Sequence, residues 1–207
     1  MELESNLKNA YSEAYKIACE KLKKLDWDEV SINTNSVFDS KSQSLLLKYL
    51  NREYRVHCPT GDVTCKSMED GVTTTVKVLL LHYLINANIR PLSGKLISFK
   101  EIKGGGAIYY QTFQKRAIQP LIKTFGQAAG RLYNAGAKLG GTAEKFGNAA
   151  VTLRIFPLVP ITYVIWQGDE EVPANATILF DDSVTSFLPG EDIVLAASFG
   201  TYELMKG

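Results

Sequence analysis

The chain has 207 residues, of which 45% are hydrophobic and 22% charged, and its formal net charge is +1. This composition is typical of a globular protein, and without a basic excess we expect no nucleic-acid partner. The longest apolar run, 78–85, is less than half of a membrane span, and the amino-terminal residues are polar and acidic. We therefore expect a cytoplasmic protein without a membrane partner.

Residues 1–26 are predicted to form an amphipathic helix, because apolar side chains recur at helical spacing. The stripe consists of Leu3, Leu7, Tyr11, Ala14, Ala18, Leu22 and Leu25. Alanine holds two of these positions and the stripe is short for a coiled coil, so we expect the helix to dock on the rest of the domain.

Residues 30–70 are predicted to be strand-rich. Alternating apolar residues begin at Val30 and Ile32, and similar runs follow at 44–49, 54–58 and 63–65. The turn-forming residues 59–62 separate the last two runs. The pattern predicts an antiparallel meander.

Residues 71–150 are predicted to be mainly helical, with Asp70 as a helix cap and a short strand at 95–99. Pro120 either kinks one long helix or opens a second one. The many glycines between 126 and 147 indicate either close helix packing or backbone exposed to a ligand.

Residues 151–207 are predicted to form strands followed by a carboxy-terminal helix. The apolar runs are 151–156, 161–166 and 178–180, and the helix starts near 188–192. Its buried face would include Ile193, Ala197 and Tyr202. Since no linker divides the chain, the expected fold is one α+β domain over 1–207, with antiparallel sheets packed against several helices.

Three consecutive carboxylates, Asp169, Glu170 and Glu171, follow the strand that ends at Trp166. Adjacent acids repel, so the pKa of at least one should be raised unless a cation or a donor lies close. Three interpretations stay open: a solvated turn, a ligand or hard-metal site, and a catalytic carboxylate.

Asp181 follows the next predicted strand, and this strand could pair with 161–166. In that case Asp169, Glu171 and Asp181 would be candidate metal ligands at one sheet edge. Asp181 two residues before Ser183 is also typical of an ordinary turn or helix cap.

Glycines 104–106 precede a predicted helix, an arrangement that suits either anion binding by backbone N–H groups or a flexible turn. Gly105 lies at the centre of this triplet. Lys100, Lys103, Tyr109 and Tyr110 flank it and would suit an anion. The spacing matches neither the dinucleotide fingerprint nor the P-loop.

Cysteine and histidine residues give little indication of catalysis. An odd count of three cysteines favours a reducing compartment and small buried thiols. His57, Cys58 and Cys65 lack a fourth zinc ligand. No nucleophile elbow is present, so a triad hydrolase is not expected.

Several segments, taken together and in order, resemble the family of the domain of unknown function numbered 3786, found in anaerobic bacteria and archaea. They are 91–100, 139–141, 156–160, 166–171, 178–181 and 188–192. The resemblance covers residues 75–195, and Trp166-Gln-Gly-Asp-Glu-Glu171 is its most specific part. The chain departs from the family pattern at Val172, where an aromatic residue is usual, and at Asn148, where aspartate is usual.

Some relatives carry an iron–sulfur domain of the corrinoid-protein type, so the resemblance implies a link to corrinoid or one-carbon metabolism. The chain itself lacks the four closely spaced cysteines that an iron–sulfur cluster needs. We therefore expect no such cluster in this chain.

The leading hypothesis is a small-ligand-binding or accessory protein. Its expected pocket is lined by Trp166, Asp169, Glu170, Glu171, Gly105, Tyr109 and Tyr110. A metal-assisted hydrolase or transferase using the carboxylates, and an interaction module that docks on a protein partner through the amino-terminal helix, are the alternatives.

Overall fold

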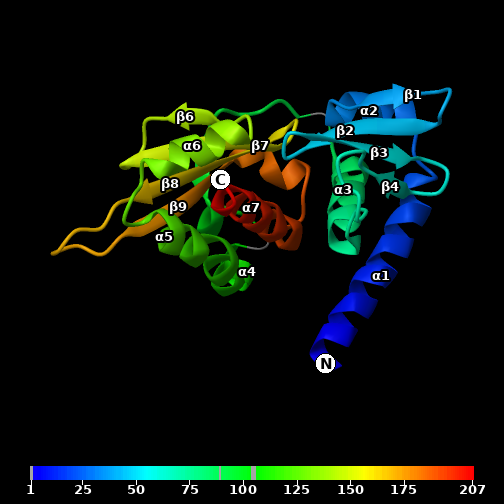
Figure 1. Cartoon of the computed structure of the whole chain (residues 1–207). Coiled ribbons are helices and arrows are strands. Elements are labelled where there is room, and N and C mark those ends of the chain that lie inside the picture. The colour runs from blue at the N-terminus through cyan, green and yellow to red at the C-terminus, as the bar shows by residue number, and fades with distance from the viewer. Residues whose placement is uncertain (1, 89, 104–105) are drawn as a thin grey trace. The chain divides into compact units, whose positions relative to one another are not determined.

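The computed structural model describes residues 2–88, 90–103 and 106–207 (Figure 1). The chain divides into two compact units, Met1–Arg90 and Pro91–Gly207. Each unit combines helices with one antiparallel sheet. The predicted α+β class, with antiparallel sheets and an amino-terminal helix, is confirmed, whereas the single domain stays a prediction.

The first unit contains a four-stranded sheet with the order β1-β2-β3-β4. Its elements are α1 (Glu2–Leu22), α2 (Trp27–Thr34), β1 (Val37–Asp39), β2 (Ser44–Tyr49), β3 (Arg52–His57), β4 (Asp62–Thr64) and α3 (Thr74–Asn86). Alternate residues of β2 and β3, among them Leu45, Leu47 and Val56, are buried, as the period of a strand requires. The predicted meander is therefore confirmed.

Helix α1 packs on α3, and Ala18 and Leu22 of its stripe are buried while Tyr11 is half-buried. The side chains of Leu3 and Leu7 lie outside the described residues. Docking of a partner through this stripe therefore stays a prediction. The three cysteines are buried and free, as expected.

Two boundaries in the first unit differ from the predictions. The strand predicted at Val30 and Ile32 is wrong, because these residues belong to α2. The Asp26 carboxylate caps this helix by accepting hydrogen bonds from the N–H groups of Asp28 (3.0 Å) and Glu29 (3.1 Å). Helix α3 is capped by Thr73 rather than Asp70.

The second unit contains a five-stranded antiparallel sheet with the order β5-β9-β8-β7-β6. Its strands are β5 (Leu96–Ser98), β6 (Thr142–Glu144), β7 (Ala149–Phe156), β8 (Val159–Trp166) and β9 (Asn175–Asp181). Its α-helices are α4 (Gly106–Phe113), α5 (Gln119–Phe125), α6 (Arg131–Lys138) and α7 (Gly190–Met205). Shorter turns are the 3-10 helices η1 (Phe99–Glu101) and η3 (Asp182–Ser186) and the π-helix η2 (Gln114–Ile118).

Helices α5, α6 and α7 pack against the strands β7, β8 and β9 (Figure 1). A Cβ atom at Gly136 would collide with Val151, and one at Gly200 would collide with Tyr163. Tyr163 is fully buried and donates a hydrogen bond to the Ala197 carbonyl (3.0 Å), and burial raises its pKa. At Gly136, the close-packing interpretation of the glycine-rich region is confirmed.

Pro120 opens α5 at its first turn, directly after the π-helical turn η2. The Gln119 N–H donates to the Gln114 carbonyl, which is the wider π-type spacing. Proline has no N–H to bond and is therefore tolerated at this first turn. On α7, Ile193 and Ala197 are buried as predicted, but Tyr202 is 52% exposed, because its position lies on the solvent side of the helix.

Among the described residues, no helix combines the length and the apolar character needed to span a membrane.

Candidate functional site

The segment 166–168 at the end of β8 is held by contacts with other loops. The Gln167 side-chain oxygen accepts a hydrogen bond from the Ala129 N–H (3.1 Å), and the Gly168 N–H donates to the Gly126 carbonyl (3.0 Å). The Asn148 side-chain oxygen accepts from the Gln167 N–H (2.9 Å). Aspartate offers the same acceptor, so the departure at Asn148 keeps this contact.

Asp169 closes a turn in the loop between β8 and β9. Its carboxylate accepts hydrogen bonds from the N–H groups of Val172 (2.7 Å) and Glu171 (2.9 Å), and its own N–H donates to the Val172 carbonyl (2.9 Å). These bonds lower the pKa of Asp169. Glu170 and Glu171 are exposed, and Trp166 is 42% exposed. For Asp169, the raised pKa expected of an acidic cluster is not found.

The candidate metal ligands Asp169, Glu171 and Asp181 are not brought together. Trp166 pairs with Asn175 at one end of β9, and Asp181 ends the same strand. At ~3.3 Å per residue the two ends are roughly 20 Å apart. Of the residues described, no three His, Cys, Asp or Glu form a group that could hold a metal ion. Asp169 and Glu171, in the loop before β9, and Asp181, at the far end of β9, therefore do not meet at one sheet edge.

Asp181 instead has a structural role. It is 4% exposed and accepts hydrogen bonds from both the N–H and the hydroxyl of Ser183 (2.9 and 2.6 Å). It also accepts from the N–H and hydroxyl of Ser93 (3.0 Å each) and from the Gly94 N–H (2.7 Å). Burial alone raises the pKa of Asp181, but these donors outweigh burial and lower it to about 2. The interpretation as a cap is confirmed, since Asp181 is the N-cap of η3.

A cavity of about 330 Å³ lies beside β9, within the second unit. Its walls come from the end of β5, from η1, α4, η2 and α5, and from the first residues of β9. The apolar part is formed by Phe99, Phe113, Ile118, Ile122, Ala176 and Ile178. The polar part is formed by Ser98, Lys100, Tyr110, Gln114, Gln119, Asn175 and Thr177.

The apolar wall is held rigidly by local structure. The Phe99 and Phe113 rings stack at 4.3 Å with an interplanar angle of 9°. Phe99 opens η1, where the Glu101 carboxylate accepts hydrogen bonds from the N–H (2.8 Å) and hydroxyl (2.7 Å) of Ser98. Gly106 begins α4 so close to the Phe99 carbonyl that no Cβ fits there. This capping box fixes the turn that places Phe99 and Lys100 in the cavity wall.

One side of the cavity is formed by the cation Lys100 and the aromatic ring of Tyr110. The Lys100 ammonium lies 4.5 Å from the centre of the Tyr110 ring, within the range of a cation–π contact. The Gln114 amide donates to the Tyr110 hydroxyl (3.3 Å). Gln114 begins the π-helical turn, and single π-helical turns are frequent at functional sites.

The structure separates the predicted ligand-binding residues into three groups. Tyr110 lines the cavity, and Tyr109 is half-buried next to it in sequence without lining it. Trp166, the last residue of β8, and Asp169, Glu170 and Glu171 in the β8–β9 loop do not line the cavity. Gly105 lies outside the described residues. Sequence analysis missed Gln114, Gln119 and Asn175, which no motif marks.

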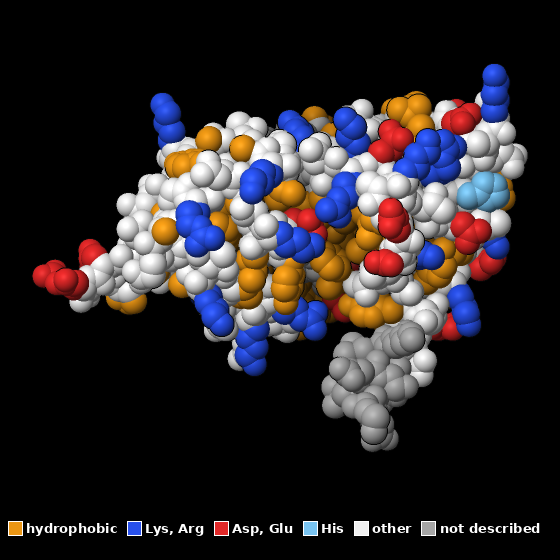
Figure 2. Space-filling view, viewed as in Figure 1, with side chains coloured by type: hydrophobic (Ala, Val, Ile, Leu, Met, Phe, Trp, Pro, Cys, Tyr) orange, Lys and Arg blue, Asp and Glu red, His pale blue; other side chains and the backbone are white. Residues whose placement is uncertain are grey.

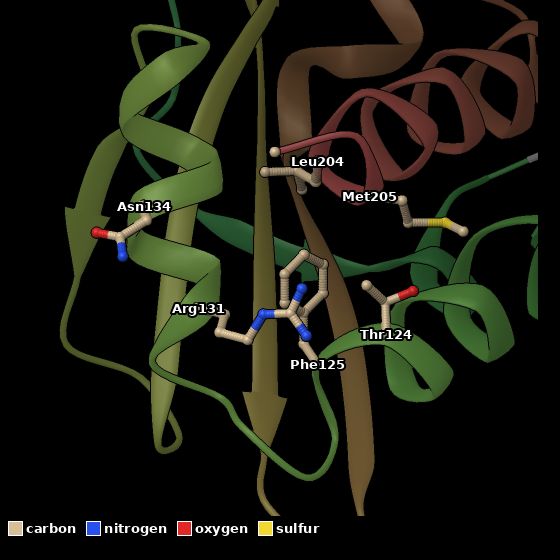
Figure 3. A pocket seen from close by; sticks show the side chains of 7 residues that line it. Thr124, Phe125, Arg131, Asn134, Leu204 and Met205 are labelled. Carbon is tan, nitrogen blue, oxygen red and sulfur yellow. The ribbon is translucent and has the colours of Figure 1, made fainter.

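A second cavity, of about 90 Å³, lies between α5, α6 and the end of α7 (Figure 3). Figure 3 shows Thr124 and Phe125 from α5, Arg131 and Asn134 from α6, and Leu204 and Met205 from α7. Its volume corresponds to roughly three water molecules at ~30 Å³ each. The larger cavity is therefore the candidate ligand site.

The model of the family described as "Domain of unknown function (DUF3786)" matches residues 26–202. Comparisons with curated proteins and with solved structures give no match. The matched range extends beyond the 75–195 covered by the sequence resemblance.

Proposed function

The chain belongs to the DUF3786 family, and we propose that its second unit binds a small organic ligand in the cavity beside β9. The observation that carries this proposal is the cavity itself. Its volume of about 330 Å³ falls at the lower end of the range of small-molecule sites, roughly 300–1,000 Å³. Like such sites it combines apolar side chains with polar groups at defined positions, here six apolar and seven polar residues.

The two kinds of wall suit different parts of one ligand. Phe113, Ile118 and Ile178 are buried and offer contact to an apolar body. The side-chain amides of Gln114, Gln119 and Asn175 can each donate and accept hydrogen bonds, and they come from three different elements. A ligand with an apolar ring and a polar end would satisfy both walls.

Binding is better supported than catalysis. None of the described residues that line the cavity is His, Cys, Asp or Glu, the side chains that most often serve as bases, nucleophiles or metal ligands. For the metal-assisted alternative, the described residues contain no group of three or more His, Cys, Asp or Glu that could hold a metal ion.

The link to corrinoid or one-carbon metabolism stays a prediction that rests on the family resemblance. A corrinoid macrocycle is much larger than the molecules that a cavity of about 330 Å³ holds. If the link exists, it concerns a smaller metabolite or a partner protein.

A cavity-filling variant tests the proposal. Ile122 lines the cavity and is half-buried, so Ile122→Trp should fill it, whereas Ile108 on α4 is 78% exposed and lines no described cavity. Ile108→Trp is therefore the matched control. A fragment library is screened by ligand-observed NMR against the unmodified protein and both variants. Fragments should lose binding only to Ile122→Trp; equal binding to all three proteins would refute the proposal.

Native mass spectrometry of protein purified anaerobically from its host gives a second, independent test. A copurifying small molecule should be present on the unmodified protein and missing from Ile122→Trp. A molecule retained by both would bind elsewhere.

A further inference from the structure

We infer that the ligand of this cavity is an organic anion, a small molecule whose apolar body carries a phosphate or carboxylate group. This inference rests on the proposed function and adds the chemical class of the ligand. It comes from the distribution of charge in the second unit, which is independent of the shape of the cavity.

Charge is segregated along the second unit. Residues 91–140 contain eight lysines and arginines but a single acid, Glu101, whereas residues 141–207 contain three basic and nine acidic residues. The net charge is thus +7 in the first segment and −6 in the second. The net charge of +1 for the whole chain therefore conceals a strongly basic segment in this unit.

The basic segment supplies most of the cavity wall. Lys100 lies in η1, Lys115 and Arg116 in η2, and Lys123 in α5. Figure 2 shows basic side chains over this helical part, whereas acidic side chains form the end of the β8–β9 loop. An anion that approaches the cavity therefore meets mainly positive charge.

Few of these cations have a partner of opposite charge among the described residues: Lys95 lowers the pKa of Glu101, and the Lys138 ammonium donates to the Gly207 oxygen (3.0 Å). All eight are exposed, and in the ranges 90–103 and 106–140 none of them forms a salt bridge. Glu101, the one acid of the segment, already accepts two hydrogen bonds from Ser98. Uncompensated positive charge around a cavity raises the local concentration of anions.

Lys100 is the cation placed to contact the ligand. Its ammonium lies against the Tyr110 ring, at the cavity wall, and Gln114 is hydrogen-bonded to the same tyrosine. An oxyanion between Lys100 and the amide groups of Gln114 and Gln119 would receive charge-assisted hydrogen bonds. A neutral ligand gains no such bond, and a cationic ligand is repelled.

A polyanion such as nucleic acid would also be attracted to this surface. The apolar part of the cavity wall, which includes the buried Phe113 and Ile178, favours a small molecule instead, because contacts to a nucleic-acid backbone use exposed cations and need no such apolar surface. Binding of an oligonucleotide is therefore one outcome of the test.

The test uses four probes with the same aromatic body: phenyl phosphate, phenylacetate, 2-phenylethanol and benzylamine. Their affinities are measured by ligand-observed NMR for the unmodified protein, Lys100→Gln and the control Lys145→Gln. Lys145 is exposed in the turn between β6 and β7, outside the cavity wall. The two anions should bind at least about tenfold more tightly than the alcohol and the amine, and added salt should weaken them.

Lys100→Gln should reduce affinity for the anions about tenfold and leave the alcohol unchanged, while Lys145→Gln should change neither. The ratio between the affinities for phenyl phosphate and phenylacetate then shows which of the two oxyanions the site prefers.

Equal binding of the alcohol and the anions to the unmodified protein would overturn the inference while leaving the proposed function intact. Loss of every probe from Ile122→Trp is the separate criterion for the proposed function. A short single-stranded oligonucleotide that displaces phenyl phosphate and binds more tightly would also overturn the inference.

Discussion

The β8–β9 loop with Trp166 before it and the cavity beside β9 both combine aromatic and charged side chains, but their charges have different partners. In the loop, the Asp169 carboxylate is bound to two backbone N–H groups of its own turn. In the cavity wall, Lys100 has a tyrosine ring beside it and no salt-bridge partner among the described residues. The Asp169 carboxylate in the acidic loop therefore has a structural role, whereas the Lys100 ammonium in the cavity wall is available to a ligand.

Asp181 extends this comparison, because its carboxylate accepts five hydrogen bonds from Ser93, Gly94 and Ser183. Asp181→Ala removes the acceptor for five hydrogen bonds and leaves buried donors unpaired. We expect the free energy of unfolding of the second unit to fall by about 3–5 kcal/mol. Chemical denaturation monitored by circular dichroism measures this loss. A loss below about 1 kcal/mol would contradict the structural role of Asp181.

The pH dependence of stability gives a sharper test of the stabilising role of the Asp181 carboxylate. The pKa of Asp181 is lowered from 3.8 to about 2, so the ionised carboxylate stabilises the folded state above pH 3.8. This contribution is lost as pH falls from 3.8 towards 2. The unmodified protein should therefore lose stability more steeply over this range than Asp181→Asn, which keeps an acceptor but does not titrate. Parallel pH profiles of the two proteins would show that Asp181 is not the titrating group.

Asp169→Ala should have a smaller effect, because the turn it closes is exposed. We expect a slight fall in melting temperature and no change in binding of phenyl phosphate. Asp169→Asn serves as the control, since it keeps one acceptor for the N–H groups of Glu171 and Val172. A large loss of probe binding in Asp169→Ala would move the ligand site to the loop.

The double variant Glu170→Gln, Glu171→Gln should have the smallest effect. Both side chains are exposed, and surface charges of this kind contribute little to stability. Melting temperature and affinity for phenyl phosphate should match those of the unmodified protein in calorimetry and NMR. Tighter binding of the anion by more than about twofold would mean that the loop repels the ligand and lies closer to it than the cavity wall does.

Local patterns predicted most of the strands and the start of α7. Alternating apolar residues marked β2 and β3, because side chains on a strand point alternately to its two faces, and continuous apolar runs marked β8 and β9. Helix α2 was missed since Val30 and Ile32, two residues apart, resemble strand alternation in so short a segment. Its cap, Asp26, was the available indication of a helix.

The candidate site was predicted only in part. Tyr110 and Lys100 were found because they flank the glycine triplet, and the cap role of Asp181 was found because Ser183 follows it. Gln114 and Asn175 were missed, since polar amides at these positions carry no motif of their own. At Asp169 the adjacent acids indicated repulsion and a raised pKa, whereas the backbone N–H groups of the turn donate to the carboxylate and lower its pKa.

The sequence by itself determined the α+β class, the order of most strands and the segregation of charge between 91–140 and 141–207, because periodicity, propensity and charge are local properties. Only the tertiary structure decided which residues meet. Asp181 is 88 residues from Ser93 in the chain, and the cavity combines 98–122 with 175–178. Such contacts depend on strand pairing and helix packing over long separations, and no local pattern specifies them.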